Sequence, residues 1–216
     1  MRFNELVELA GGLGCFDLPL LVQMAGGDRE SIRVQLSRWM KAGKVIGLRR
    51  GYYALAMPFR RTPLVAEVLA NQLCHPSYLS GLWALAYYGL IPEGVAWFTS
   101  VTSRSPCRYD NVVGVFVYQN VSQERFFGYK QVEAGSGAFF LAEPEKAVLD
   151  HWHLSDGAWT AQRLTEMRYQ YCQKLDRLRL QEYAARFYSP RIMKATEIFL
   201  KQLAGVTADE GENVEL

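Results

Sequence analysis

The chain has 216 residues, a formal net charge of +2 and 50% hydrophobic residues, a composition typical of globular proteins. Its longest apolar run, residues 82–91, is about half of the roughly 20 residues that cross a bilayer, so we expect no membrane partner. The first apolar stretch contains two glutamates, which argues against a signal peptide. The four cysteines form no CxxC pair, so we expect reduced thiols in a cytoplasm.

Basic residues gather at the N-terminal end of the chain. Residues 1–62 contain ten Lys or Arg and five Asp or Glu, whereas the remaining residues carry a small negative excess. This asymmetry favours a polyanionic partner at the N-terminal end. A chance scatter of charges explains it equally well, so charge alone does not decide.

The N-terminal segment has the pattern of a small DNA-binding domain. Asp17 and Asp28 are suitable N-caps, and Gly51 permits the tight turn of a hairpin. The predicted elements are helices at 3–10, 17–25 and 28–42, then strands at 45–48 and 52–55. This order is typical of a winged helix-turn-helix, which we place at residues 1–57 and call the head.

The rest of the chain predicts an α+β domain at residues 64–206, which we call the body. A linker at 58–63 joins it to the head, and an acidic flexible tail is expected at 207–216. Within the body we expect helices at 64–73, 80–88 and 143–152, an antiparallel sheet of three to five strands between 95 and 142, and two or three helices from 159 to 203 with a break at Ser189–Pro190. The expected fold class is therefore α+β, with C-terminal helices following an antiparallel sheet.

The third helix is the candidate recognition helix. Its apolar stripe is Ile32, Leu36, Trp39 and Met40, and the opposite face carries donors suited to base edges and phosphates. The alternative is a solvated polar face beside an ordinary hairpin. The candidate DNA-contact residues on this helix, in the loop that follows it and at the hairpin tip are Ser31, Arg33, Gln35, Arg38, Lys41, Lys44, Arg49 and Arg50.

Catalytic and metal-binding patterns are weak. His151 and His153 point away from each other on a helix, so we expect no metal site and no cofactor. Glu143, Glu145 and Lys146 resemble part of a nuclease site but lack its spacing, because such sites place Glu-x-Lys on a strand. We expect no enzyme; a nuclease targeted by the head remains the enzymatic alternative.

Several motifs resemble those of a known family. The segment SRWMKAGKVIGLRRGYYAL resembles the recognition helix and wing of AbiEi-type antitoxins, which are repressors of type IV toxin–antitoxin (abortive infection) systems. Downstream, TSVTS, GVFVY, FFGYKQVE and AEPEKAVLDHWHL follow the order of that family's second domain. The positions that match the second domain are Tyr87, Tyr88, Gly89, Pro92, Thr99, Ser100, Thr102, Phe127, Gly128, Tyr129, Glu145, Lys146 and Asp150.

The resemblance implies two functions. The winged helix would bind inverted repeats in the protein's own promoter, with Arg38, Arg49 and Arg50 in the DNA-contact positions. The body would help to counter a nucleotidyltransferase-like toxin without a stable complex between the two proteins. A monomer or weak dimer is expected. A stand-alone regulator without a toxin is the alternative.

Overall fold

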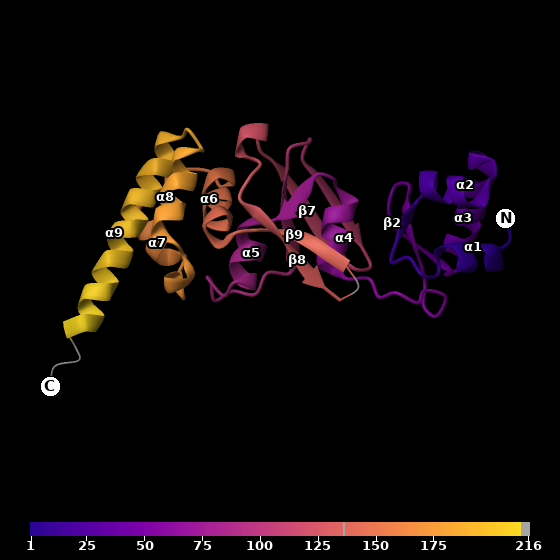
Figure 1. Ribbon diagram of the computed structural model, residues 1–216, viewed down its shortest axis with the longest axis horizontal. Helices are drawn as coiled ribbons and strands as arrows, with labels where there is room; N and C mark the ends of the chain where they lie inside the picture. Colours follow the sequence, from indigo (N-terminus) through magenta and orange to yellow (C-terminus); the bar gives the residue numbers. More distant parts are fainter. Residues whose placement is uncertain (136, 213–216) are drawn as a thin grey trace.

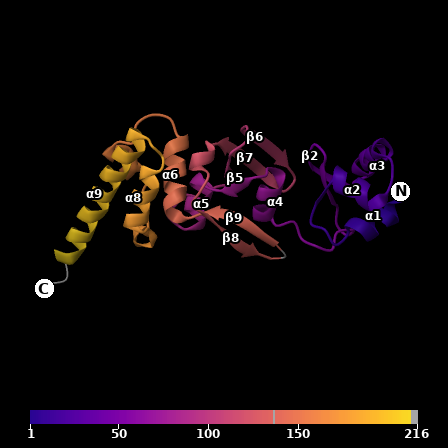
Figure 2. The ribbon, with the colours of Figure 1, turned by 45° about the horizontal axis from the view of Figure 1, so that its top comes forward.

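The chain folds as a mixed α+β protein whose N-terminus and last described helix lie at opposite ends (Figure 1). The computed structural model describes residues 1–135 and 137–212. The head lies at one end, the body's sheet in the middle and the C-terminal helices at the other end (Figure 2). No helix among the described residues combines the length and the apolar character that a bilayer crossing requires.

The head contains three helices and a three-stranded antiparallel sheet with the order β1-β3-β2. The Asp17 carboxylate accepts a hydrogen bond from the Leu20 N–H at 2.8 Å, and Asp28 caps the next helix in the same way. Gly51, with φ 77°, forms the hairpin turn, where a residue with a side chain would be strained. The elements are α1 (Phe3–Ala10), β1 (Phe16–Asp17), α2 (Leu18–Ala25), α3 (Arg29–Lys41), β2 (Val45–Arg49) and β3 (Tyr52–Leu55), which confirms the predicted helices and hairpin.

The body is built on a six-stranded sheet with the order β6-β7-β5-β4-β9-β8. Its strands are β4 (Ser77–Leu79), β5 (Trp97–Thr102), β6 (Cys107–Asn111), β7 (Gly114–Asn120), β8 (Tyr129–Ala134) and β9 (Gly137–Ala142). Its helices are α4 (Ala66–Leu73), α5 (Gly81–Tyr87), α6 (Pro144–Leu154), α7 (Ala161–Glu166), α8 (Arg177–Ala185) and α9 (Pro190–Glu212), with short 3-10 turns η1 (Gln123–Arg125) and η2 (Cys172–Lys174).

The prediction of an antiparallel sheet was wrong, because the sheet is mixed. β5 pairs with β7 in parallel, and β4 pairs with β9 in parallel. The hairpin β6–β7 reverses the chain once more before β7 returns to β5, so these two strands run in the same direction. The short strand β4 was not predicted, since three buried residues carry no readable alternation.

Three C-terminal helices lie in the region where two or three were expected, but the helical stretch is also interrupted at residues 167–176, which was not predicted. The helical structure is interrupted before Pro190, which is the first residue of α9. Proline is favoured in the first turn of a helix. The helix then continues to Glu212, so the segment expected to be a tail from residue 207 is helical as far as 212. Residues 213–216 of that expected tail lie outside the described residues.

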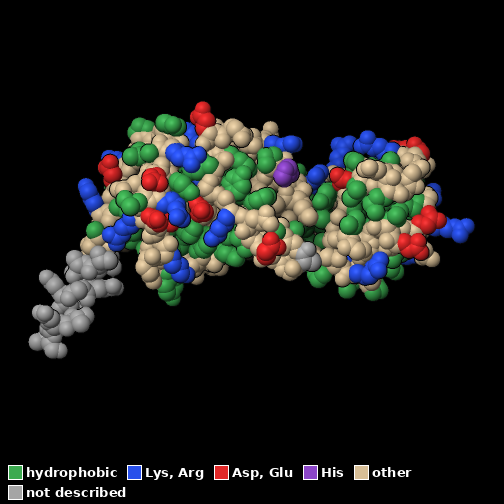
Figure 3. All heavy atoms as spheres, viewed as in Figure 1, with side chains coloured by type: hydrophobic (Ala, Val, Ile, Leu, Met, Phe, Trp, Pro, Cys, Tyr) green, Lys and Arg blue, Asp and Glu red, His purple; other side chains and the backbone are tan. Residues whose placement is uncertain are grey.

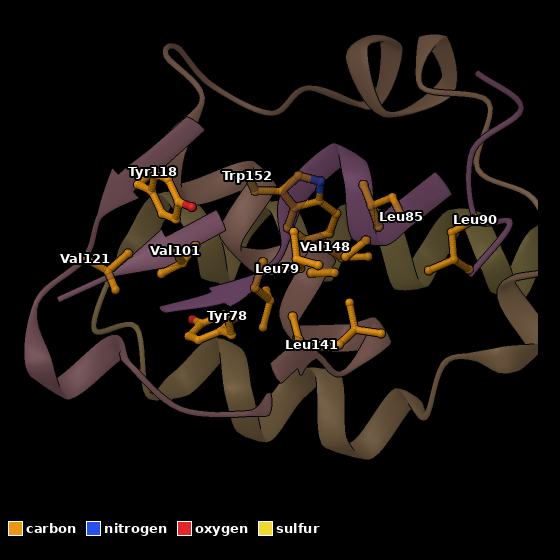
Figure 4. Close-up of a cluster of buried hydrophobic side chains, with 14 of the residues drawn as sticks. Tyr78, Leu79, Leu85, Leu90, Val101, Tyr118, Val121, Leu141, Val148 and Trp152 are labelled. Carbon is orange, nitrogen blue, oxygen red and sulfur yellow. The ribbon is translucent and has the colours of Figure 1, made fainter. Parts of the chain in front are cut away.

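Two hydrophobic cores meet at the head's sheet. Phe16, Ile32 and Leu36 belong to the head core, whereas Figure 4 shows the body core around Trp152. Leu48 of β2, only 2% exposed, belongs to the body core although it lies in the head's hairpin. Ala54 of β3 does so too. One face of the head's sheet thus covers its own helices, and the other face packs against the body.

The segment 58–63, expected to be a linker, is hydrogen-bonded to the head. The Arg61 N–H donates to the Gly11 carbonyl at 2.8 Å, and the Thr62 hydroxyl donates to the Gly12 carbonyl at 2.8 Å. These bonds hold the segment against the end of α1.

Candidate nucleic-acid interface

A groove with a volume of about 1360 Å³ runs between α3 and the β2–β3 hairpin. Figure 3 shows Lys and Arg side chains gathered along the upper edge of the head. We call this feature the basic groove. The basic residues that line it are Arg29, Arg33, Arg38, Lys41, Arg49 and Arg50, and the acidic ones are Asp17, Glu30 and Asp110. Its lining therefore has an excess of positive charge, which attracts a polyanion.

The α3 side of the basic groove offers three unpaired cations. Arg29, Arg38 and Lys41 are exposed and take part in none of the ion pairs found among the described residues. Arg33 is different, because its guanidinium pairs with Glu30 at 2.7 Å. Arg29, Arg38 and Lys41 are thus the α3 cations that are free to meet a phosphate or a base.

The hairpin side presents two arginines in different settings. Arg50, in the turn, is exposed. Arg49 is half-buried, with its guanidinium carbon 5.1 Å from the centre of the Tyr52 ring and 5.9 Å from that of Tyr109. Its Nη1 donates to the Arg50 carbonyl at 3.2 Å. Both arginines line the groove, and Arg50 is the more exposed of the two.

Three predicted contact residues lie outside the basic groove. The Lys44 ammonium sits 4.8 Å from the centre of the Phe3 ring, on α1. Ser31 and Gln35 line a separate shallow pocket of about 290 Å³, which Arg38 also borders. The structure therefore brings together Arg33, Arg38, Lys41, Arg49 and Arg50, and leaves out Ser31, Gln35 and Lys44.

The N-terminus of α3 is already occupied by a carboxylate. Asp28 accepts a hydrogen bond from the Ser31 N–H at 2.8 Å, and this bond lowers the pKa of Asp28 below its usual value. The carboxylate is thus charged at neutral pH and would repel an incoming phosphate. The carboxylate of Asp28 therefore disfavours the predicted phosphate contact through Ser31.

Sequence reasoning missed several residues of the groove. Arg29 is the first residue of α3 and lies on its groove side, a position that helical periodicity from Arg33 indicates. Asp110 comes from β6 of the body, and no local signal in the sequence places it beside the hairpin.

The body contains a fully buried ion pair between Lys146 and Asp150, both of which are 0% exposed. The Lys146 ammonium also donates to the Tyr78 hydroxyl at 2.9 Å. Asp150 accepts hydrogen bonds from the hydroxyls of Tyr78 at 3.1 Å and Ser80 at 2.7 Å. Burial lowers the pKa of Lys146, and the Asp150 carboxylate opposes that shift by favouring the charged amine.

The same network explains the glycine in the Phe-Gly-Tyr segment. Gly128 has φ 69°, and a Cβ there would lie 2.9 Å from the Tyr183 ring and 3.2 Å from the Lys146 side chain. A side chain would therefore be strained and would also clash with the network. Several of the motif positions that resemble the family thus serve the interior of the body.

The nuclease alternative does not fit this geometry. Glu145 is 1% exposed and accepts a hydrogen bond from the Asp176 N–H at 2.7 Å, and Lys146 is enclosed. Neither side chain can reach a phosphodiester in solution. Within residues 1–135 and 137–212, no group of three or more His, Cys, Asp or Glu is placed to hold a metal ion.

His151 is expected to make folding stability depend on pH. Burial lowers its pKa to about 4, and the Arg163 cation adds to this shift. Because the unfolded imidazole has a pKa of about 6.5, the unfolded chain takes up the proton first as the pH falls. The stability is complete above about pH 6.5, and roughly 2–3 kcal/mol is lost as the pH falls towards 4.

This loss is measurable by urea unfolding at pH 7 and pH 4.5. The variant His151→Gln should lose less stability than the parent between these two pH values, and His75→Gln, at an exposed position, serves as the control. An equal loss in the parent and in His151→Gln would show that His151 is not responsible.

No protein-family model matches the chain, and no curated protein matches it. The inference of function therefore depends on the basic groove and on the motifs of the sequence.

Proposed function

We propose that the chain is a sequence-specific transcriptional repressor that binds double-stranded DNA through a winged helix-turn-helix in its head. The observation that carries this proposal is the basic groove between α3 and the β2–β3 hairpin. The proposal is supported by the three helices of the head and by its three-stranded antiparallel sheet, of which the β2–β3 hairpin follows α3. In a winged-helix domain the last helix would enter the major groove and the hairpin would reach the backbone beside it. Arg38 would contact bases, and Lys41 and Arg50 would contact phosphates.

Binding to the DNA immediately upstream of the protein's own gene tests this proposal. Fluorescence anisotropy should give tight binding to that duplex and weaker binding to a shuffled duplex of equal length. The affinity should fall as salt rises, because phosphate contacts release counterions. Equal affinity for both duplexes would contradict sequence-specific repression.

We further propose that the repressor is an antitoxin of the AbiEi kind, acting in the bacterial cytoplasm. The support is the order of short motifs from the recognition helix to the Ala-Glu-Pro-Glu-Lys segment. On this proposal the head binds inverted repeats in its own promoter, and the body counters a nucleotidyltransferase-like toxin without holding it in a stable complex.

A rescue assay separates this role from that of a stand-alone regulator. If a nucleotidyltransferase-like gene neighbours this one, cells that express it should survive when the full chain is co-expressed. The Arg38→Ala/Arg50→Ala variant should also rescue them, since both residues lie in the head. Failure of the parent to rescue would leave the regulator without a toxin partner.

A further inference from the structure

The β2–β3 hairpin of the head, which is the wing of the proposed winged helix, contacts the β6–β7 hairpin of the body. The Asn111 side-chain amide, at the end of β6, donates to the Leu48 carbonyl of β2 at 3.0 Å. The same side chain accepts a hydrogen bond from the Val113 N–H at 2.9 Å, which fixes it in the β6–β7 turn. The hydrogen bond to Leu48 and the burial of that side chain in the body core join the wing to the body.

The wing arginine is included in this contact. The Arg49 guanidinium lies between two aromatic rings, Tyr52 from its own hairpin and Tyr109 from β6 of the body. Its Nε is buried and has no hydrogen-bond partner, so the side chain is held mainly by the rings and by one bond from Nη1 to a carbonyl. The residue also lines the basic groove, as does Asp110 of β6.

We infer that the β6–β7 hairpin of the body positions Arg49 for contact with duplex DNA, so that Tyr109 and Asn111 are positioning residues for the DNA-binding function proposed above, on which this inference rests. A free arginine loses rotamer entropy when it binds a phosphate or a base. A guanidinium that already lies against aromatic faces has part of that loss removed in advance. The DNA-binding surface is then formed by both parts of the chain.

Two substitutions at Tyr109 test this role on the full-length chain. Tyr109→Leu removes the aromatic face and should weaken binding to the upstream duplex about two- to fivefold, the range of a cation–π contact. Tyr109→Phe keeps that face and should bind as the parent does. Val112→Ala, at the 79% exposed tip of the same hairpin, is the matched control and should leave the affinity unchanged.

A double-mutant cycle shows whether Tyr109 acts through Arg49. In the Arg49→Ala background, Tyr109→Leu should cause no further loss of affinity. Asn111→Ala provides a second variant of the same contact and should show the same dependence on Arg49. Thermal unfolding of each variant accompanies the affinities, since a loss caused by instability would appear in both backgrounds.

The outcomes separate this inference from the proposed function. If Arg38→Ala weakens binding while Tyr109→Leu has the same effect with and without Arg49, or has none, the positioning role is overturned and the DNA-binding function stands. If the parent binds no duplex, or Arg38→Ala binds as tightly as the parent, the proposed function fails and the positioning role fails with it.

Discussion

Replacement of Arg38 by alanine is expected to weaken binding to the upstream duplex by about 1–3 kcal/mol, or roughly 5- to 150-fold, because Arg38 is an exposed, unpaired arginine on the groove side of α3. An arginine that reads a base loses discrimination at one base pair when it is removed. Titration against duplexes that differ at single positions will reveal that base pair as the one at which the variant no longer discriminates.

Lys44→Ala is the matched control for Arg38→Ala. It removes one positive charge from the same head, at a residue that lies over Phe3 and does not line the basic groove. Its effect should stay below about twofold at moderate salt, since distant charges are screened. Similar losses for the two variants would indicate that net charge, and not the groove, determines DNA binding.

Removal of Lys146 is expected to destabilise the body by about 3–5 kcal/mol, because Lys146→Ala leaves the Asp150 carboxylate buried without its cation. Asp150→Ala should cost a similar amount for the converse reason. The free energy of unfolding in urea, followed by circular dichroism, measures both effects. A loss below about 1 kcal/mol for either single variant would contradict the account of the pair.

Two further variants separate the burial of this pair from its charge. Lys146→Met/Asp150→Leu removes both charges and should cost less than either single variant, since no uncompensated charge remains. Glu93→Ala breaks the ion pair between Glu93 and Arg168, whose side chains are 50% and 65% exposed respectively. Because the pair is exposed, this variant should change the free energy of unfolding by less than about 1 kcal/mol.

The elements of the head could be predicted because their determinants are local. Asp17 and Asp28 each cap a helix by accepting a hydrogen bond from the N–H three residues later. Gly51 lies in the turn between the end of β2 and the start of β3. The sequence around each of these residues is enough to place the element. The same holds for Pro190, which begins the last helix.

The arrangement of the body's sheet depends on contacts that no local pattern contains. The residues of β5 carry no local signal that tells whether a neighbouring strand runs parallel or antiparallel, because burial simply increases along the strand from Trp97 to Thr102. β5 and β7 run parallel because β6 lies between them in the chain and is antiparallel to β7. β4 and β9 run parallel through the pairing of Leu79 with Leu141, which lie far apart in the sequence. The strands were therefore predictable, and their relative directions were not.

The candidate interface could be predicted in part for the same reason. Helical periodicity placed Arg38 and Lys41 on one face of α3, and the turn placed Arg50 at the tip. Lys44 follows the helix in an irregular segment, where periodicity gives no direction for its side chain. Asp110 and Tyr109 reach the hairpin only through the packing of the body on the head.

The sheet shared between the two cores has a consequence for how the molecule can be divided. Cutting the chain after residue 63 would uncover Leu48 and Ala54, which the intact protein buries. An excised head would thus carry an exposed apolar surface and would tend to self-associate. The head is not an interchangeable module, and grafting it onto another protein would require polar replacements on that side.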